Sequence, residues 1–220
     1  MHLSSYVCQK KYNMKKGIVL VGTMLTLLIV SCGGKKTTEN ASENASESAA
    51  VAKFTIDTMA SSLKWKGSKS EEDFHIGSLK FKSGTLSAQG QSNVSGEFVV
   101  NMNSIRVEDK ELPADKKEML KGHLADKDYF DVSKFPEVVV KVSGYKDGKL
   151  ATTISLLGKE MKQDIPVTLT NDGKKAAIAG TFDIDFKSLN IEGLKVNEKK
   201  PEETIKSVIS FDLNLVLNNK

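Results

Sequence analysis

The sequence predicts a mainly β domain: an antiparallel barrel of about eight strands, with one short helix capping an end. Three observations support this fold class. From Lys53 onward, apolar and polar residues alternate with a period of two, which is typical of strands with one buried face. Short turn signals separate these segments, and a single stretch has helical periodicity. Many evenly spaced antiparallel strands favour a sandwich or a closed barrel, and closure removes exposed sheet edges.

The strand segments follow from this alternation. In the clearest case, Phe182, Ile184 and Phe186 alternate with polar residues. Asp147-Gly148 and Asp172-Gly173 are hairpin signals, and we expect a further turn at Lys82-Ser83-Gly84. The alternation gives eight or nine strands, near residues 53–57, 62–67, 74–82, 93–103, 137–145, 149–157, 164–170, 176–186 and 206–217.

One helix is expected within residues 113–124, with Asp115 as its N-cap. Gly122 weakens the helix, so it should be short and should close one barrel end. A second irregular segment is expected at 190–203, where Gly and Pro prevent a regular strand. The helical stripe consists of Met119, Leu120, His123 and Leu124.

The N-terminus carries targeting signals. Lysines precede an uncharged apolar run, Gly17 to Val30, that is too short to span a bilayer and suits a secretory signal. The sequence Ile-Val-Ser before Cys32 resembles a bacterial lipobox, which implies cleavage before Cys32 and lipidation of its thiol. An uncleaved anchor helix is the alternative, and either Met1 or Met14 is a suitable start.

The chain is therefore divided into three parts. Residues 1–31 are the expected lipoprotein signal peptide, and residues 53–220 form the barrel domain. Between them, 32–52 holds the lipidated cysteine and a segment rich in Ser, Ala, Asn and Glu, which predicts a disordered tether.

Composition excludes several functions. The chain has 32 Lys and Arg against 28 Asp and Glu, and four lysines but no acid precede residue 33. The rest is neutral, so we expect no nucleic-acid partner. Cys8 and Cys32 are the only cysteines, and the three histidines are scattered. With no catalytic motif or metal-ligand spacing, the sequence predicts no enzyme, no metal site and no cofactor.

Four segments resemble the YceI-like family. The most specific is GHLADKDYFDVSKFP, residues 122–136. Trp65-x-Gly67 with His75-x-Gly77, Gly96-x-Phe98 leading to Ile105, and residues 154–167 resemble other strands of that family. The resemblance covers residues 53–217 and implies a lipocalin-like barrel. One departure is Lys159 to Lys162, where the family commonly has a Thr-Lys or Thr-Arg pair.

The resemblance also implies a function. It predicts binding of a long apolar molecule, a polyisoprenoid or related amphiphile, in the barrel lumen, without catalysis. Together with Cys32, this describes a membrane-tethered lipid-binding module of the bacterial envelope. Gly33 after the cysteine favours the outer over the inner membrane, with the domain facing the periplasm. The alternative is a structural or protein-interaction β-domain with a filled core. The sequence does not indicate an oligomeric state.

The inward positions of four strands are the candidate lipid-binding residues, because alternation places them on one surface. They are Phe98, Val100, Met102, Val138, Val140, Val142, Phe182, Ile184, Phe186, Phe211, Leu213 and Leu215.

Single residues outside this set have structural and functional interpretations. We expect Trp65 to line or plug one barrel end. His123 could bind a ligand head group at the barrel mouth, but a structural hydrogen bond to a backbone carbonyl is favoured. The same two interpretations apply to His75, and the structural one is again favoured. The pairs Lys116-Lys117 and Lys199-Lys200 suit solvated faces, although either could face anionic lipid heads.

Overall fold

The computed structural model describes residues 50–90 and 93–220. The expected signal peptide, the lipidation site Cys32 and nearly all of the tether lie outside these residues. The described strands are β1 (Ala52–Ile56), β2 (Ser62–Ser68), β3 (Phe74–Gln89), β4 (Asn93–Val107), β5 (Glu137–Lys146), β6 (Lys149–Leu156), β7 (Lys159–Pro166), β8 (Thr168–Asn171), β9 (Lys175–Asp185) and β10 (Val208–Asn219). One helix, α1 (Ala114–Ala125), and three short 3-10 helices, η1 (Lys187–Leu189), η2 (Glu192–Leu194) and η3 (Pro201–Glu203), complete them.

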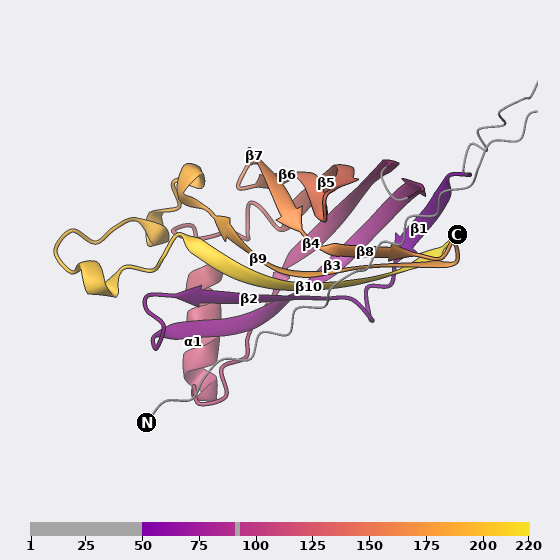
Figure 1. The fold of residues 1–220 in the computed structure, drawn as a ribbon. Helices are drawn as coiled ribbons and strands as arrows, with labels where there is room; N and C mark the ends of the chain where they lie inside the picture. The colour runs from indigo at the N-terminus through magenta and orange to yellow at the C-terminus, as the bar shows by residue number, and fades with distance from the viewer. Residues whose placement is uncertain (1–49, 91–92) are drawn as a thin grey trace, which may run out of the picture. The chain divides into compact units, whose positions relative to one another are not determined.

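The strands form one antiparallel sheet curled into a barrel (Figure 1), in the order β7-β6-β5-β4-β3-β1-β10-β9-β8. The ten described strands fill eight positions, because two positions are each shared by two consecutive strands. At the first, β1 and β2 both lie between β3 and β10. Phe54 of β1 pairs with Leu86 of β3, and Leu63 of β2 pairs with Leu79 of the same strand. The predicted barrel of about eight strands is therefore confirmed.

The barrel closes through β7 and β8, which share the second position. β7 pairs with β6, β8 pairs with β9, and only Val167 separates them. The Val167 N–H donates to the Gly148 carbonyl at 2.9 Å. At the same point β9 approaches closely, since a Cβ on Gly180 would lie 2.5 Å from the Pro166 carbonyl oxygen. A glycine in β9 is what permits this closure.

Two turn predictions had different outcomes. Asp147 and Gly148 both have positive φ, 51° and 74°, in the tight turn between β5 and β6, as predicted. The turn expected at Lys82-Ser83-Gly84 is wrong, because these residues continue β3. Gly84 serves packing instead: a Cβ there would lie 2.3 Å from Phe98 Cδ1, so its glycine makes room for that ring.

The helix was predicted at nearly its observed place, and it covers the barrel end where β4 extends beyond β5. Its C-terminal residues Leu124 and Ala125 pack against a small cluster that contains Met102 and Ile105. One detail of the prediction is wrong, because Pro113, not Asp115, occupies the N-cap position. No residue of the helix is buried, and Met119 of the expected stripe is 51% exposed.

The segment between β9 and β10 is irregular, as predicted, and contains η1, η2 and η3. It lies at the same end of the domain as α1 and the β2–β3 hairpin (Figure 1). Within the described ranges, no helix has the length and apolar character needed to cross a membrane.

Candidate ligand-binding cavity

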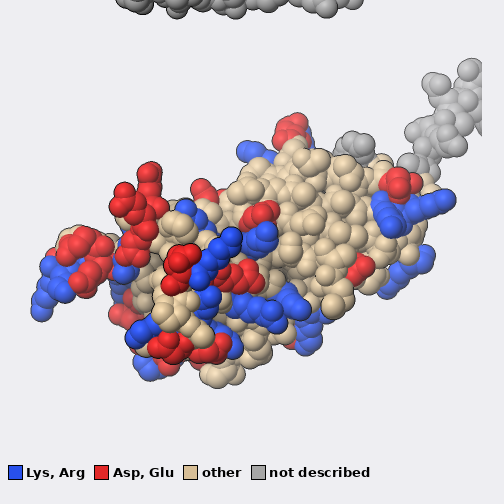
Figure 2. Space-filling view, turned by 90° about the horizontal axis from the view of Figure 1, so that it is seen from below, with Lys and Arg blue, Asp and Glu red and all other residues tan. Residues whose placement is uncertain are grey.

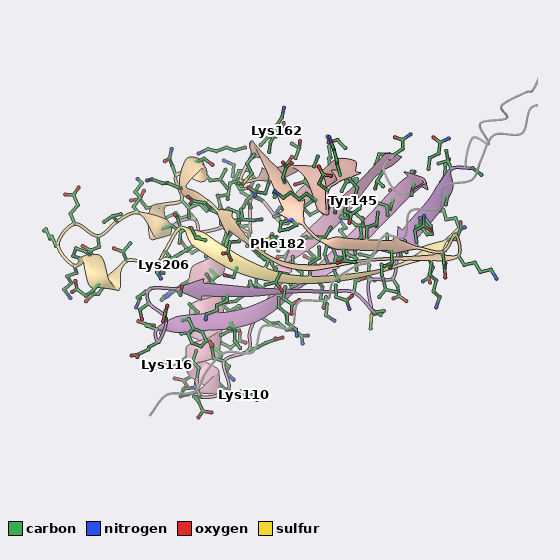
Figure 3. All side chains as sticks on the ribbon, viewed as in Figure 1. Lys110, Lys116, Tyr145, Lys162, Phe182 and Lys206 are labelled. Carbon is green, nitrogen blue, oxygen red and sulfur yellow. The ribbon has the colours of Figure 1, made fainter. Side chains whose placement is uncertain are left out.

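The barrel encloses a cavity of about 470 Å³. This volume lies within the range of roughly 300–1,000 Å³ typical of small-molecule sites. Strands β2 to β6, β9 and β10 contribute most of the lining, and the side chains are predominantly aliphatic and aromatic. Phe182, labelled in Figure 3, projects into the barrel from β9. Such a lining binds hydrocarbon without directed contacts, since burial contributes about 25 cal/mol per Å².

All the residues predicted to line the lumen border this cavity. Their common feature is the period of two, which keeps alternate side chains of a strand on one face. The set is Phe98, Val100 and Met102 of β4, Val138, Val140 and Val142 of β5, Phe182 and Ile184 of β9 with Phe186 just after it, and Phe211, Leu213 and Leu215 of β10. That these residues contact a ligand remains a prediction.

Sequence reasoning missed the contributions of β2, β3, β6 and β7. Their alternation was readable in β6, where Leu150, Thr152, Ile154 and Leu156 share the inner face. The buried Thr152 hydroxyl is satisfied, because it donates to the Gln163 carbonyl at 2.7 Å. The other missed residues of these strands are Leu63, Leu79, Phe81 and Ile165, whereas Trp65 of β2 was expected at one barrel end.

The end of the barrel formed by the last residues of β10 is packed with side chains. Leu217 follows Leu215 on the inner face of β10, yet it has no exposed surface and does not border the cavity. Around it lie the most deeply buried side chains of the domain: Phe54, Leu86, Val94 and Ile178. The filled core of the alternative interpretation therefore describes only this end, whereas the rest of the barrel surrounds the cavity.

Aromatic side chains hold part of the cavity wall in place. The Phe182 and Phe211 rings stack at 5.8 Å between centroids, and Phe186 meets Phe211 edge-on at 6.2 Å. Across the barrel, Phe81 and Phe98 form an edge-on pair at 6.5 Å. Such pairs stabilise by about 0.5–1.5 kcal/mol beyond their burial, so this wall is preorganised.

Trp65 borders the cavity, consistent with the expectation that it lines the barrel. Its ring packs over Gly77 of the paired strand, since a Cβ on Gly77 would lie 2.4 Å from Trp65 Cζ2. The indole Nε1 is buried and has no acceptor among the described residues. As the sole tryptophan of the chain, Trp65 is a natural fluorescent reporter of this cavity.

The cavity opens toward the β2–β3 hairpin and η3, where Lys69, Asp73, Glu203 and Ile205 border it; we call this end the mouth. The two carboxylates there are both paired. Asp73 lies 3.3 Å from the Lys69 ammonium, and Glu203 lies 2.6 Å from that of Lys200. The mouth is therefore lined by charges that largely cancel.

The β9–β10 connection that borders the mouth is tied at its base. Asp185 accepts hydrogen bonds from the Ser207 hydroxyl at 2.7 Å and from the Lys187 N–H at 2.9 Å. These bonds lower the pKa of Asp185, the Ser207 bond having the larger effect. Tyr129 holds the same connection by packing over Gly193, whose N–H donates to the Asp128 carbonyl at 2.7 Å.

The two histidines of the domain also border the cavity. His75 makes its contact through a side chain and not a backbone carbonyl: its Nδ1 lies 2.9 Å from Asp109 Oδ2. Asp109 Oδ1 accepts the Ile76 N–H at 2.9 Å, which orients the carboxylate. The backbone hydrogen bond expected of His123 is absent from the described structure, where its exposed ring has no partner.

Within residues 50–90 and 93–220, no group of three or more His, Cys, Asp or Glu side chains is arranged to hold a metal ion.

Comparison with known proteins gave a consistent picture. The model of the family described as YceI-like domain matches residues 47–217. The fold is similar to that of BcnA from Burkholderia cenocepacia, with a TM-score of 0.60, 17% identity, and coverage of 73% of this chain and 98% of that one. It is also similar to a polyisoprenoid binding domain from Saccharophagus degradans, with a TM-score of 0.55, 14% identity, and coverage of 78% and 100%. A comparison with curated protein sequences gave no match.

Proposed function

This chain belongs to the YceI-like domain family, and from that membership and the hollow barrel we propose that it is a lipid-binding module. It binds or carries one long apolar molecule, a polyisoprenoid or related amphiphile, in the lumen. The cavity of about 470 Å³ is the observation that carries this proposal. A barrel of eight strand positions is the size that can either fill with side chains or hold one small ligand.

The chemistry of the lining supports binding rather than catalysis. The inner wall consists mainly of Val, Leu, Ile and Phe side chains, and the carboxylates at the mouth, Asp73 and Glu203, are paired with lysines. The Saccharophagus degradans domain with the similar fold is described as polyisoprenoid binding, which is the same ligand class.

The proposed module is held at a membrane by lipid on Cys32. The support is sequence-based: the apolar run, the lipobox-like Ser31-Cys32 and the following polar segment. Each methylene of an acyl chain contributes about 0.8 kcal/mol to membrane binding, so more than one chain anchors stably. We place the anchor at the outer membrane of a bacterial envelope, with the domain facing the periplasm.

Native mass spectrometry tests the lipid-binding proposal. Protein released from a cell envelope should carry one apolar molecule that organic extraction removes. Readdition of a polyprenol should then change the emission of Trp65, because the indole borders the cavity. Protein that carries no lipid, and whose Trp65 emission does not respond to polyprenol, contradicts the proposal.

A further inference from the structure

A recess lies beside the cavity, between α1 and the start of β3. It has a volume of about 340 Å³ and is bordered by His75, Leu112, Lys116, Met119, Leu120 and His123. Three of these residues, His75, Leu120 and His123, also border the main cavity. The two hollows are therefore adjacent, and the side chains of these three residues lie at their boundary.

The recess concentrates basic side chains from two elements. Lys116 and His123 are seven residues apart on α1, which places them on one face two turns apart. His75 comes from the opposite wall, at the start of β3. Its Nδ1 faces Asp109, whose side chain is 14% exposed, so the Nε2 edge is what remains for a ligand.

No acidic side chain at the recess neutralises these basic residues, in contrast to the lysine–carboxylate pairs at the mouth. No carboxylate borders the recess, and Asp109, behind His75, is engaged by that ring and by the Ile76 N–H. Within the described part of the chain, the side chains of Lys116 and His123 form no hydrogen bond or ion pair. At the mouth, in contrast, Asp73 and Glu203 each face a lysine.

We propose that the recess binds an oxyanion head group, a phosphate or a carboxylate, of the amphiphile whose tail lies in the cavity; the inference rests on the proposed function. Lys116 supplies a fixed positive charge, and His123 and the Nε2 edge of His75 supply ring nitrogens that donate when protonated. Hydrogen bonds between an ionised donor and an oxyanion are about twice as strong as neutral ones.

A membrane surface is a less suitable occupant for this end of the domain. In Figure 2, Lys and Arg side chains lie intermixed with Asp and Glu, without a large area of one sign on the face shown. Binding to anionic lipid surfaces needs a cluster of basic residues. A single oxyanion needs only the local set at the recess.

The test compares farnesyl phosphate with farnesol in titrations that follow Trp65 emission. These probes share a tail, so the ratio of their affinities reports on the head group alone. The variants are Lys116→Gln and His123→Gln, and the matched control is Lys110→Gln. Lys110 is an exposed lysine at the same end of the domain (Figure 3) that borders neither hollow.

The unmodified chain should bind farnesyl phosphate about tenfold more tightly than farnesol, as expected for charge-assisted hydrogen bonds. Lys116→Gln and His123→Gln should each move this ratio toward one, whereas Lys110→Gln should leave it unchanged. Excess inorganic phosphate should not displace farnesyl phosphate, because tail burial provides most of the affinity.

Equal affinities of the two probes for the unmodified chain, or a ratio that all three variants preserve, overturn the head-group site and leave lipid binding intact. Displacement by inorganic phosphate overturns it too, because the recess would then be a site for free phosphate. If neither probe binds, the proposed function fails together with this inference.

Discussion

The indole of Trp65 covers Gly77 of the neighbouring strand so closely that a Cβ at position 77 would lie 2.4 Å from Cζ2. The same Cβ would lie 1.9 Å from the Arg106 carbonyl oxygen of β4, on the other side of β3. The Trp65 ring of β2 and the backbone of β4 therefore both lie too close to Gly77 of β3 to leave room for a side chain. The cavity wall at this point depends on the absence of a side chain.

Gly77→Ala should lower the stability of the domain and move Trp65. The added methyl group meets backbone as well as the ring, and overpacking of this kind costs about 1–3 kcal/mol. Thermal unfolding and the tryptophan emission maximum measure the two effects. Gly144→Ala is the control, because a Cβ there meets no heavy atom within 4 Å. Equal unfolding temperatures and equal emission maxima of the two variants would show that the contact of Trp65 with Gly77 contributes nothing to stability or to the position of the indole.

Val140→Phe should reduce lipid binding while the domain remains stable. Val140 borders the cavity, so an added ring occupies space that the ligand needs. Val94→Phe is the matched substitution at the packed end, where the side chain is 2% exposed and borders no cavity. There the ring must displace its neighbours, at a cost of about 1–3 kcal/mol. Lipid retention by native mass spectrometry and thermal unfolding should therefore separate the two variants.

The opposite pattern would contradict this assignment of the two ends. A marked loss of stability in Val140→Phe, with lipid content unchanged, would mean that the ring has no free volume around position 140.

Asp185→Asn should destabilise the domain near neutral pH and make little difference in acid. Its hydrogen bonds from Ser207 and Lys187 lower the pKa of Asp185 below the ordinary value of 3.8. The folded state then binds fewer protons than the unfolded state between these two pKa values. The stabilisation is complete above the ordinary pKa and is lost as the pH falls through the lowered one.

Thermal unfolding of both proteins across this pH range measures the effect. Asp183→Asn is the control, because Asp183 lies two residues earlier on the same strand face and accepts no side-chain hydrogen bond in the described structure. A difference between Asp185→Asn and the unmodified chain that persists undiminished in acid would contradict the assignment.

Cys32→Ala should abolish incorporation of labelled fatty acid and release the domain from the membrane fraction. The reason is chemical, since alanine has no thiol to accept the lipid. Cys8→Ala is the matched control, because Cys8 lies within the expected signal peptide. Undiminished labelling of Cys32→Ala would contradict the lipid anchor.

Most of the fold could be predicted from local pattern. Alternation with a period of two identifies strands, and it placed Phe182, Ile184 and Phe186 on the face that borders the cavity. The prediction failed where a glycine serves packing instead of a turn. Gly84 looks like a turn residue in sequence, but it is required inside β3 because the Phe98 ring lies against it.

For β4, β5, β9 and β10, the sequence alone determined which side chains face the lumen, because inward and outward positions alternate along a strand. Only the tertiary structure decided how far that lumen is hollow. The inner side chains Leu217, Phe54 and Ile178 have no exposed surface and border no cavity, whereas Val140 borders the hollow part. No single strand encodes this difference, since it depends on how opposite walls meet. Likewise, His75 and His123 are far apart in sequence and border one recess only because α1 packs beside the start of β3.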